Sequence, residues 1–377
     1  MNLKVLHIAS GGKFCGISTY TTNLIKHFEV NQNATHERIN LLTNLDFESM
    51  SKKSVFEYFR DLSRKTKKYD VIHIQNEFGL FGGAHGLDFA MKVFYLFLKS
   101  IIKHKRKIIV TYHSEPTFMK GLGLMNFENK RCAKWFRKTA KLHTTENNVK
   151  ALLHTKTTEK SYWANGFRNV CNIRHGVLER WLTPNYKIKA KEDPVVLGMF
   201  GFLSDYKGHE FALSILDLLP SNFKLYIVGG RHRNSGGEEI GNILNKANAL
   251  GLSDRILITG WIPAEDADKH QKMCDISILP YQTTELSASG AATWALTSGR
   301  PVIASNTPAF KELNEAIEDK EPMMLCHMTE RTEWVWAIKK ILNEPKLKHM
   351  LIDNCREYCD TFSWTNVCKQ HIELYKQ

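Results

Sequence analysis

Short apolar runs alternate with longer amphipathic segments along the chain, and the runs predict β-strands. In the first half these strands lie at 4–8, 40–43, 71–74, 107–112, 142–144 and 170–173. A polar segment flanked by prolines, residues 183–194, interrupts the pattern, which restarts with strands at 195–200, 224–228, 256–259, 276–279 and 301–304. Such alternation is typical of parallel sheets covered by helices. The sequence therefore predicts an α/β protein with two Rossmann-like halves and a terminal helix over 363–376.

Composition is that of a globular chain of about two domains. The 377 residues are 43% hydrophobic and 24% charged, which excludes a disordered or fibrous protein. There is no run of about 18 uncharged apolar residues, so we expect no membrane-spanning helix. The apolar N-terminus predicts a first strand rather than a signal peptide. Eight scattered cysteines without a Cys-x-x-Cys pair favour free thiols in a reducing cytoplasm over a metal site.

Positive charge is concentrated in the first half of the chain. The whole chain has a formal charge of +13, with 52 Lys and Arg against 39 Asp and Glu. Residues 1–185 hold 30 of the basic and 14 of the acidic residues. A field of this sign attracts phospholipid headgroups, acidic glycans or nucleic acid, although a lysine-rich soluble face would have the same composition. The apolar run 89–102 is either a core helix or an interfacial helix.

Three loops at predicted strand ends in the first half are candidate binding sites, because ligands bind at the carboxyl ends of parallel strands. A glycine-rich loop with Gly11, Gly12 and Gly16 follows the first strand and opens a helix. The backbone there can approach a ligand, or the glycines simply form a tight turn. Asn76 and Glu77 lie at the start of a second loop, which resembles a recognition loop. His113 directly follows another strand. Its side chain either faces a bound ligand or lies in the core, hydrogen-bonded to a backbone group.

Two loops in the second half are suited to binding phosphate. Gly201 ends the first strand of this half, and Lys207 follows near the start of a helix. An ammonium group beside helix N–H groups is a phosphate clamp, whereas a solvent-facing lysine has no such role. Ser289 and Gly290 begin another predicted helix, whose first N–H groups would point at a diphosphate.

Taken in chain order, these loops resemble retaining glycosyltransferases of the GT-B fold, family 4 (glycosyl transferases group 1), over nearly the whole chain. The matching motifs are the loop 11–16, Asp70-Val-Ile-His with the loop 75–83, His113, Arg174-His-Gly-Val177, Gly201 to Gly208, Tyr226-Ile-Val-Gly-Gly230, Thr259-Gly-Trp261, Asp275-Ile-Ser-Ile-Leu-Pro-Tyr281, and Ser289-Gly290 with Gly299-Arg-Pro-Val-Ile-Ala304. Each motif alone is weak, and their common order makes the resemblance specific.

The resemblance implies an architecture and a set of roles. We expect an acceptor-binding domain at 1–182, a donor-binding domain at 195–360 and a helix at 361–377 that crosses back to the first domain, with a deep cleft between the domains. The donor would be a UDP- or GDP-linked sugar, with no prosthetic group and no metal. Its implied contacts are Gly201, Lys207, Arg231, Gly260, Trp261, Ser289 and Gly290. The implied catalytic residues are His113, Lys207 and Glu285, and the implied acceptor residues are Gly11, Gly12, Gly16, Asn76 and Glu77.

The sequence departs from the family pattern at two places. The family's paired glutamates fall on Leu286 and Trp294 here, with Glu285 one residue from the first position. The arginine usual before Lys207 is absent, and Arg231 or Arg233 is the proposed substitute. From the basic first half we expect the acceptor to be an anionic lipid-linked or cell-surface glycan, and the enzyme to lie in the cytoplasm at the inner membrane face. The alternatives are a modified base in DNA, or a non-catalytic sugar-binding homologue.

Overall fold

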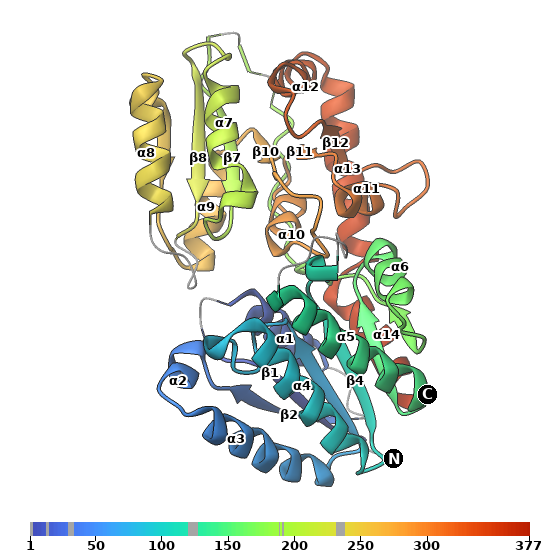
Figure 1. The fold of residues 1–377 in the computed structure, drawn as a ribbon. Coiled ribbons are helices and arrows are strands. Elements are labelled where there is room, and N and C mark those ends of the chain that lie inside the picture. Colours follow the sequence, from blue (N-terminus) through green and yellow to red (C-terminus); the bar gives the residue numbers. More distant parts are fainter. Residues whose placement is uncertain are drawn as a thin grey trace. The chain divides into compact units, whose positions relative to one another are not determined.

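The protein consists of two compact α/β units (Figure 1). The computed structural model describes residues 3–12, 15–28, 34–119, 127–187, 189–190, 192–230 and 238–377, with backbone only at 264–265. The first unit is Met1–His175 with Trp364–Gln377, and the second is Gly176–Ser363. The terminal helix thus packs within the first unit. Among the described residues, no helix is long and apolar enough to cross a membrane.

The first unit contains a six-stranded parallel sheet of order β2-β1-β3-β4-β5-β6. Its strands are β1 (Leu3–Ser10), β2 (Ala34–Leu41), β3 (Val71–Asn76), β4 (Lys107–Tyr112), β5 (Val149–Leu153) and β6 (Val170–Asn172). Its helices are α1 (Gly16–Phe28), α2 (Asn44–Glu48), α3 (Lys52–Lys65), α4 (Leu87–Ile102), α5 (Phe127–Thr145), α6 (Lys156–Ala164) and α14 (Trp364–Lys376), with 3-10 turns at Thr66–Lys68, Gly83–His85 and Thr117–Met119.

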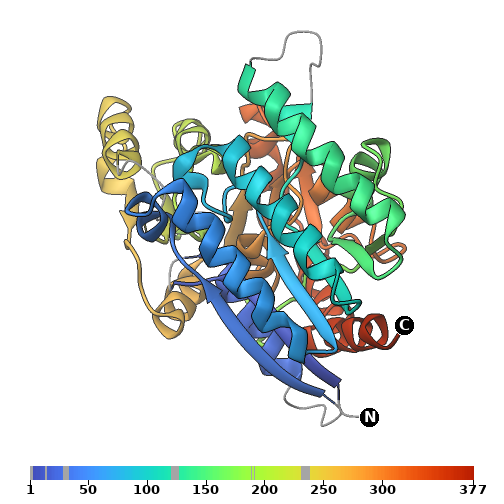
Figure 2. The ribbon, with the colours of Figure 1, turned by 60° about the horizontal axis from the view of Figure 1, so that its bottom comes forward.

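The two faces of this sheet differ in polarity because side chains alternate along each strand. Leu6 and Ile8 point to an apolar core formed with α3, α4 and α5, which lie side by side in Figures 1 and 2. His7, between them, belongs to the opposite face, where α14 packs. Histidines gather on that face, and we call six of them the histidine cluster: His7, His36, His73, His113, His154 and His371.

The histidine cluster is connected by short contacts. The rings of His7 and His73 lie 5.5 Å apart, and those of His73 and His371 lie 5.7 Å apart. The Tyr375 hydroxyl of α14 lies 2.6 Å from Nδ1 of His73. Burial lowers the pKa of all six rings, to about 4 for His36 and His371 and to about 3 for His113. The terminal helix therefore packs on neutral imidazoles.

The second unit also contains a six-stranded parallel sheet, of order β12-β11-β10-β7-β8-β9. Its strands are β7 (Val195–Phe200), β8 (Phe223–Val228), β9 (Ile256–Ile258), β10 (Ile276–Leu279), β11 (Val302–Ser305) and β12 (Met323–Cys326). Its helices are α7 (His209–Leu216), α8 (Glu239–Ala249), α9 (Ala264–Met273), α10 (Gly290–Leu296), α11 (Pro308–Asn314), α12 (Arg331–Asn343) and α13 (Pro345–Thr361), with 3-10 turns at Asp205–Lys207 and Ser253–Arg255.

The predicted α/β class is confirmed, and the structure corrects individual strands. The strand predicted at 142–144 is wrong, because α5 continues to Thr145 and the strand that follows is β5. Buried α5 residues at helical spacing, among them Phe136 and His143, extend the helix through this segment. Strand β12 was not predicted, since its Met-Met-Leu-Cys sequence lacks β-branched and aromatic residues.

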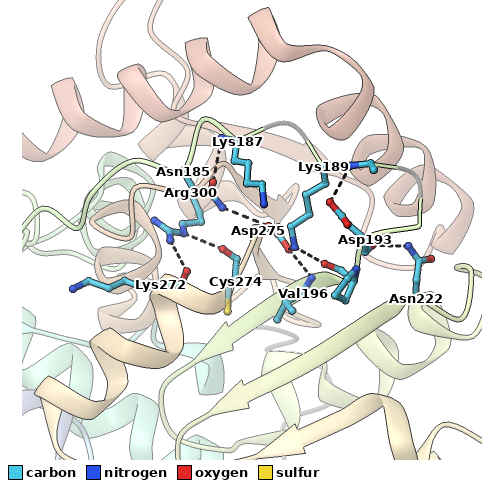
Figure 3. Close-up of polar contacts among 12 residues, drawn as sticks. Asn185, Lys187, Lys189, Asp193, Val196, Asn222, Lys272, Cys274, Asp275 and Arg300 are labelled. Carbon is cyan, nitrogen blue, oxygen red and sulfur yellow. Dashed lines mark hydrogen bonds and ion pairs between the residues drawn. The ribbon is translucent and has the colours of Figure 1, made fainter.

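The polar segment 183–194 is attached to the second unit by buried charged groups (Figure 3). Asp275 accepts hydrogen bonds from the Lys189 ammonium at 2.6 Å and the Val196 amide at 2.8 Å. Arg300 donates to the Thr183 carbonyl at 2.7 Å and to the Cys274 carbonyl at 2.9 Å. Both residues are more than nine-tenths buried, so the charges are compensated inside the unit.

We expect Asp275→Asn to lower the free energy of unfolding by about 2 kcal/mol, because the partly buried Lys189 ammonium loses its buried counter-ion. The matched control is Asp353→Asn. Asp353 is exposed and accepts from the Tyr186 hydroxyl of the same segment at 2.9 Å. Urea unfolding measures both variants. A loss at Asp275 no larger than at Asp353 would show that the buried pair does not stabilise the segment.

Candidate functional site

Glycines allow three loops at the carboxyl end of the second sheet to pack in direct backbone contact. A Cβ on Gly229, after β8, would lie 2.0 Å from the Gly201 carbonyl oxygen, after β7. A Cβ on Gly230 would lie 2.4 Å from the Trp261 backbone nitrogen, after β9. Such approaches exclude any side chain at these two positions. The three loops therefore form one layer, which we call the glycine layer. It lies at the carboxyl ends of the strands, where ligands bind in open α/β sheets.

A fourth glycine joins the loop after β10 to this layer. Gly208 has φ +73°, and a Cβ there would lie 1.9 Å from the Pro280 carbonyl oxygen. Next to it, the Gln282 amide donates to the Tyr206 carbonyl at 2.6 Å. The turn that contains Lys207 is thus fixed from both sides.

Lys207 is 7% exposed, and its ammonium nitrogen lies over Gly201. A Cβ on Gly201 would be 2.9 Å from this nitrogen and 3.2 Å from the Ala291 Cβ of α10. Within the described ranges, no hydrogen bond or ion pair is recorded for the ammonium group. Burial lowers its pKa to about 8, so the group is still cationic at neutral pH. A buried, uncompensated cation at this edge of the sheet is suited to an anionic ligand.

Ser289 is the N-cap of α10, as the sequence predicts for a helix that starts there. Its hydroxyl accepts from the Ala292 amide at 3.1 Å and contacts the buried Tyr281 hydroxyl at 2.8 Å. Gly290 has open space where a side chain would be. The start of α10 therefore has its backbone accessible next to Ala291, the same residue that approaches Gly201.

The other donor-side predictions fall into three groups. Gly260 and Trp261 lie in the glycine layer, where the Trp261 ring is 52% exposed and available for stacking. Glu285 lies exposed in the loop between β10 and α10, and its amide donates to the Thr283 hydroxyl at 3.1 Å. Arg231 and Arg233 lie outside the described residues.

The structure gives Trp294 a partner that the sequence did not predict. The resemblance implies a glutamate at this position. The Arg180 guanidinium lies 4.0 Å from the Trp294 ring centroid and forms an ion pair with Asp268. The buried Gln271 amide donates to the Trp294 carbonyl at 3.0 Å. No local pattern links residue 180 to residue 294, since the contact depends on the folding of the segment before 183. An arginine–aromatic contact thus replaces a carboxylate at this position.

His113 lies in the first unit, at the end of β4. Its Nε2 lies 2.8 Å from Oε1 of Gln75, a carbonyl oxygen that can only accept, so the proton is on Nε2. The ring also contacts Tyr20 of α1 at 5.0 Å and His154 at 5.3 Å. His113 is therefore a neutral imidazole at the edge of the histidine cluster, with its orientation set by Gln75.

The glycine loop after β1 is held by Arg38, a residue that the sequence did not single out. Its guanidinium donates to the Ser10 carbonyl at 3.0 Å and to the Ser18 hydroxyl at 2.8 Å. Gly12 has φ +112°, and Gly11 packs against β2, where a Cβ would lie 3.2 Å from that of Asn40. At Gly16, the first residue of α1, nothing fills the side-chain space.

Asn76 is the last residue of β3 and Glu77 follows it, and the Asn76 carbonyl accepts from the His113 amide at 3.0 Å. Asn76 is buried, and its Oδ1 has no recorded hydrogen-bond partner among the described residues. Glu77 is exposed, although desolvation by the surrounding protein raises the pKa of its carboxyl. The structure thus brings Asn76 and His113 together at adjacent strand ends.

Comparisons with known proteins find a family match for part of the chain. Residues 185–358 match the model described as glycosyl transferases group 1. The chain is 22% identical over 154 residues to D-inositol 3-phosphate glycosyltransferase of Saccharomonospora viridis, and 23% identical over 186 residues to the enzyme of the same name from Corynebacterium jeikeium. These segments cover 40% and 48% of the chain and only 34% and 43% of the relatives' own length.

Solved structures match over the full length. Anabaena Alr3699/HepE in complex with UDP-glucose has a TM-score of 0.72 and 15% identity, with 100% of both chains covered. Sucrose-phosphate synthase from Thermosynechococcus elongatus has a TM-score of 0.75 and 17% identity, with 100% of this chain and 99% of that chain covered. At these identities the likeness shows the fold, and the family match covers most of the second unit. Residues 185–358 thus match the group 1 glycosyltransferases, and the chain as a whole has the GT-B fold.

Proposed function

We propose that the protein is a glycosyltransferase, which transfers a hexose from a nucleoside-diphosphate sugar to an acceptor hydroxyl, with retention of anomeric configuration and without a metal. The acceptor is a cell-surface glycan or its lipid-linked precursor. The observation that carries the donor assignment is the buried Lys207 ammonium, which lies over Gly201 and beside the start of α10 and has no counter-ion among the described residues. Relatives of the fold crystallised with UDP and with UDP-glucose support the donor class.

The proposed chemistry requires compensation of the charge that develops on the departing diphosphate. Lys207 and the amides at Ser289–Gly290 would provide it from fixed positions. The departing phosphate oxygen then accepts the proton of the attacking hydroxyl as the glycosidic bond to the acceptor forms. The exposed Glu285 is proposed as a polar contact to the sugar, and Trp261 as the surface against which the base packs.

The acceptor is assigned to the strand-end loops of the first unit. Neutral His113, oriented by Gln75, would contact the transferred sugar. The buried Asn76 oxygen and the open position at Gly16 provide further polar or backbone contacts. The reaction is placed in the cytoplasm, at the inner face of the membrane, because the first half of the chain holds most of the positive charge.

A thermal-shift panel with UDP, GDP, ADP, CDP and their sugars tests the donor assignment. One nucleotide should raise the unfolding midpoint, because a ligand present at about 100 times its Kd stabilises the folded state by about 2.7 kcal/mol. The response should weaken as the pH rises past about 8, since Lys207 loses its charge in that range. If no nucleotide shifts the midpoint, the second unit does not bind a donor and the chain is a non-catalytic homologue.

A further inference from the structure

Helices α3, α4 and α5 form the most basic surface of the first unit. They hold 13 Lys and Arg, five on α3, two on α4 and six on α5, against four Asp and Glu. The three helices lie side by side over one face of the sheet (Figures 1 and 2). Their inner sides form the apolar core, so the charged residues occupy the outer sides. The run 89–102 is therefore a helix with one side in the core and a second side at the surface.

The surface contains a compact group of lysines on aromatic rings, which we call the basic aromatic patch. Its members are Lys92, Tyr95 and Leu96 of α4 and Lys134, Trp135 and Lys138 of α5. The Trp135 ring has the ammonium groups of Lys138, Lys134 and Lys92 at 4.6, 5.7 and 5.9 Å from its centroid. Tyr95 packs on Trp135 at 5.6 Å, which joins the two helices.

No ion pair joins these lysines to a carboxylate of the described residues. The recorded ion pairs on the three helices join Arg60 and Arg64 to Asp61, and Arg131 to Asp88. In the part of the chain that the structure describes, none involves Lys92, Lys134 or Lys138. Three like charges gathered on one ring repel each other, so an external anion would be attracted to this point more strongly than to isolated lysines.

Apolar groups are exposed on the same helices. Leu96 is 39% exposed and follows Tyr95 on α4, one turn from Lys92. Phe127, the first residue of α5, is 75% exposed and lies under the Arg131 guanidinium at 5.5 Å. Half-buried Tyr and Trp rings with lysine side chains around them are typical of protein surfaces at the headgroup level of a bilayer.

We propose that the basic aromatic patch docks the first unit on an anionic phospholipid surface. The lysines would pair with headgroup phosphates while Leu96 and Phe127 enter the boundary with the acyl chains. A lipid surface accounts for both the uncompensated charge and the exposed apolar side chains, whereas nucleic acid would account for the charge alone. The inference deepens the proposed function and rests on it for the presence of a membrane-bound acceptor.

Co-sedimentation with vesicles tests the patch. The full chain should bind vesicles of phosphatidylglycerol mixed with phosphatidylcholine, bind phosphatidylcholine alone far less, and be released by added salt. Changing Lys92, Lys134 and Lys138 to Ala together should lower the partition coefficient about 100-fold, at about 1 kcal/mol per lysine. Phe127→Ser, at an exposed position, should lower it severalfold.

The matched control changes Lys26, Lys160 and Lys369 to Ala, which removes the same charge from exposed positions of α1, α6 and α14. The proposal is overturned if both triple variants lose binding equally, or if the full chain binds neutral vesicles as tightly as anionic ones. It is also overturned if duplex DNA binds at the patch more tightly than the vesicles. The nucleotide thermal shift is measured on the same proteins. Vesicle binding without any nucleotide response would refute the proposed function and leave the patch intact.

Discussion

Lys207→Ala should reduce sugar transfer by about 2–4 kcal/mol of barrier, or roughly 30- to 1000-fold in rate. The Lys207 ammonium is the buried cation over Gly201, and its charge would act on the departing diphosphate. Because that charge develops most fully in the transition state, the loss should appear in kcat as well as in donor affinity. The measurement is steady-state kinetics with the donor identified by the thermal-shift panel.

Two further variants separate the effect of losing the Lys207 charge from the effect of disturbing the fold. Lys207→Met keeps an unbranched side chain in the buried space and should be nearly as impaired as Lys207→Ala. Lys339→Ala removes an exposed lysine from α12 of the same unit and should leave turnover unchanged. Normal turnover in both Lys207 variants would eliminate the phosphate-clamp role, even if the chain is an active transferase.

Mild acid should destabilise the first unit well before the second. Each buried imidazole of the histidine cluster is neutral in the folded state, whereas an unfolded histidine takes up a proton near pH 6.5. The folded-state pKa is the lower one, so stability falls as the pH drops below about 6.5, by up to about 1.4 kcal/mol per pH unit for each ring. For His371 this loss continues to about pH 4. Several rings acting together make the effect large.

Hydrogen exchange, corrected for intrinsic rates, locates this loss. Peptides from β3 and α14 should lose protection at about pH 5, while those from β10 and β11 keep it. His371→Gln removes one titrating ring and should make the acid response shallower. His349→Gln changes an exposed histidine of the second unit and should not. An equal loss in both units would contradict the role of the cluster.

The positions of the candidate loops could be predicted from the sequence, because each follows a predicted strand and most contain glycine. Gly201 and Ser289 lie at strand and helix ends as the pattern indicates. The burial of Lys207 could not be predicted, since it depends on close packing between its turn and the loop after β10. The same holds for Arg180 on Trp294, which are far apart in the chain.

The histidine cluster shows another limit of sequence reasoning. The period-two pattern of β1 and β3 places His7 and His73 on one face, and that much is readable from Leu-His-Ile and Ile-His-Ile. The helix that covers this face is more than 290 residues further along the chain. Only the folded unit shows that His371 and Tyr375 are the residues that complete the cluster.

The glycine layer also restricts which substitutions this protein can accept during evolution. Every single-nucleotide missense change in a glycine codon yields a residue with a Cβ atom. At Gly208, Gly229 and Gly230 that atom would lie within 2.4 Å of a backbone atom of another loop. No neighbouring side chain can move aside to compensate, because the obstacle is main chain. Descendants of this sequence are therefore expected to retain these three glycines even where donor preference diverges, since the constraint comes from the packing of the loops and not from the ligand.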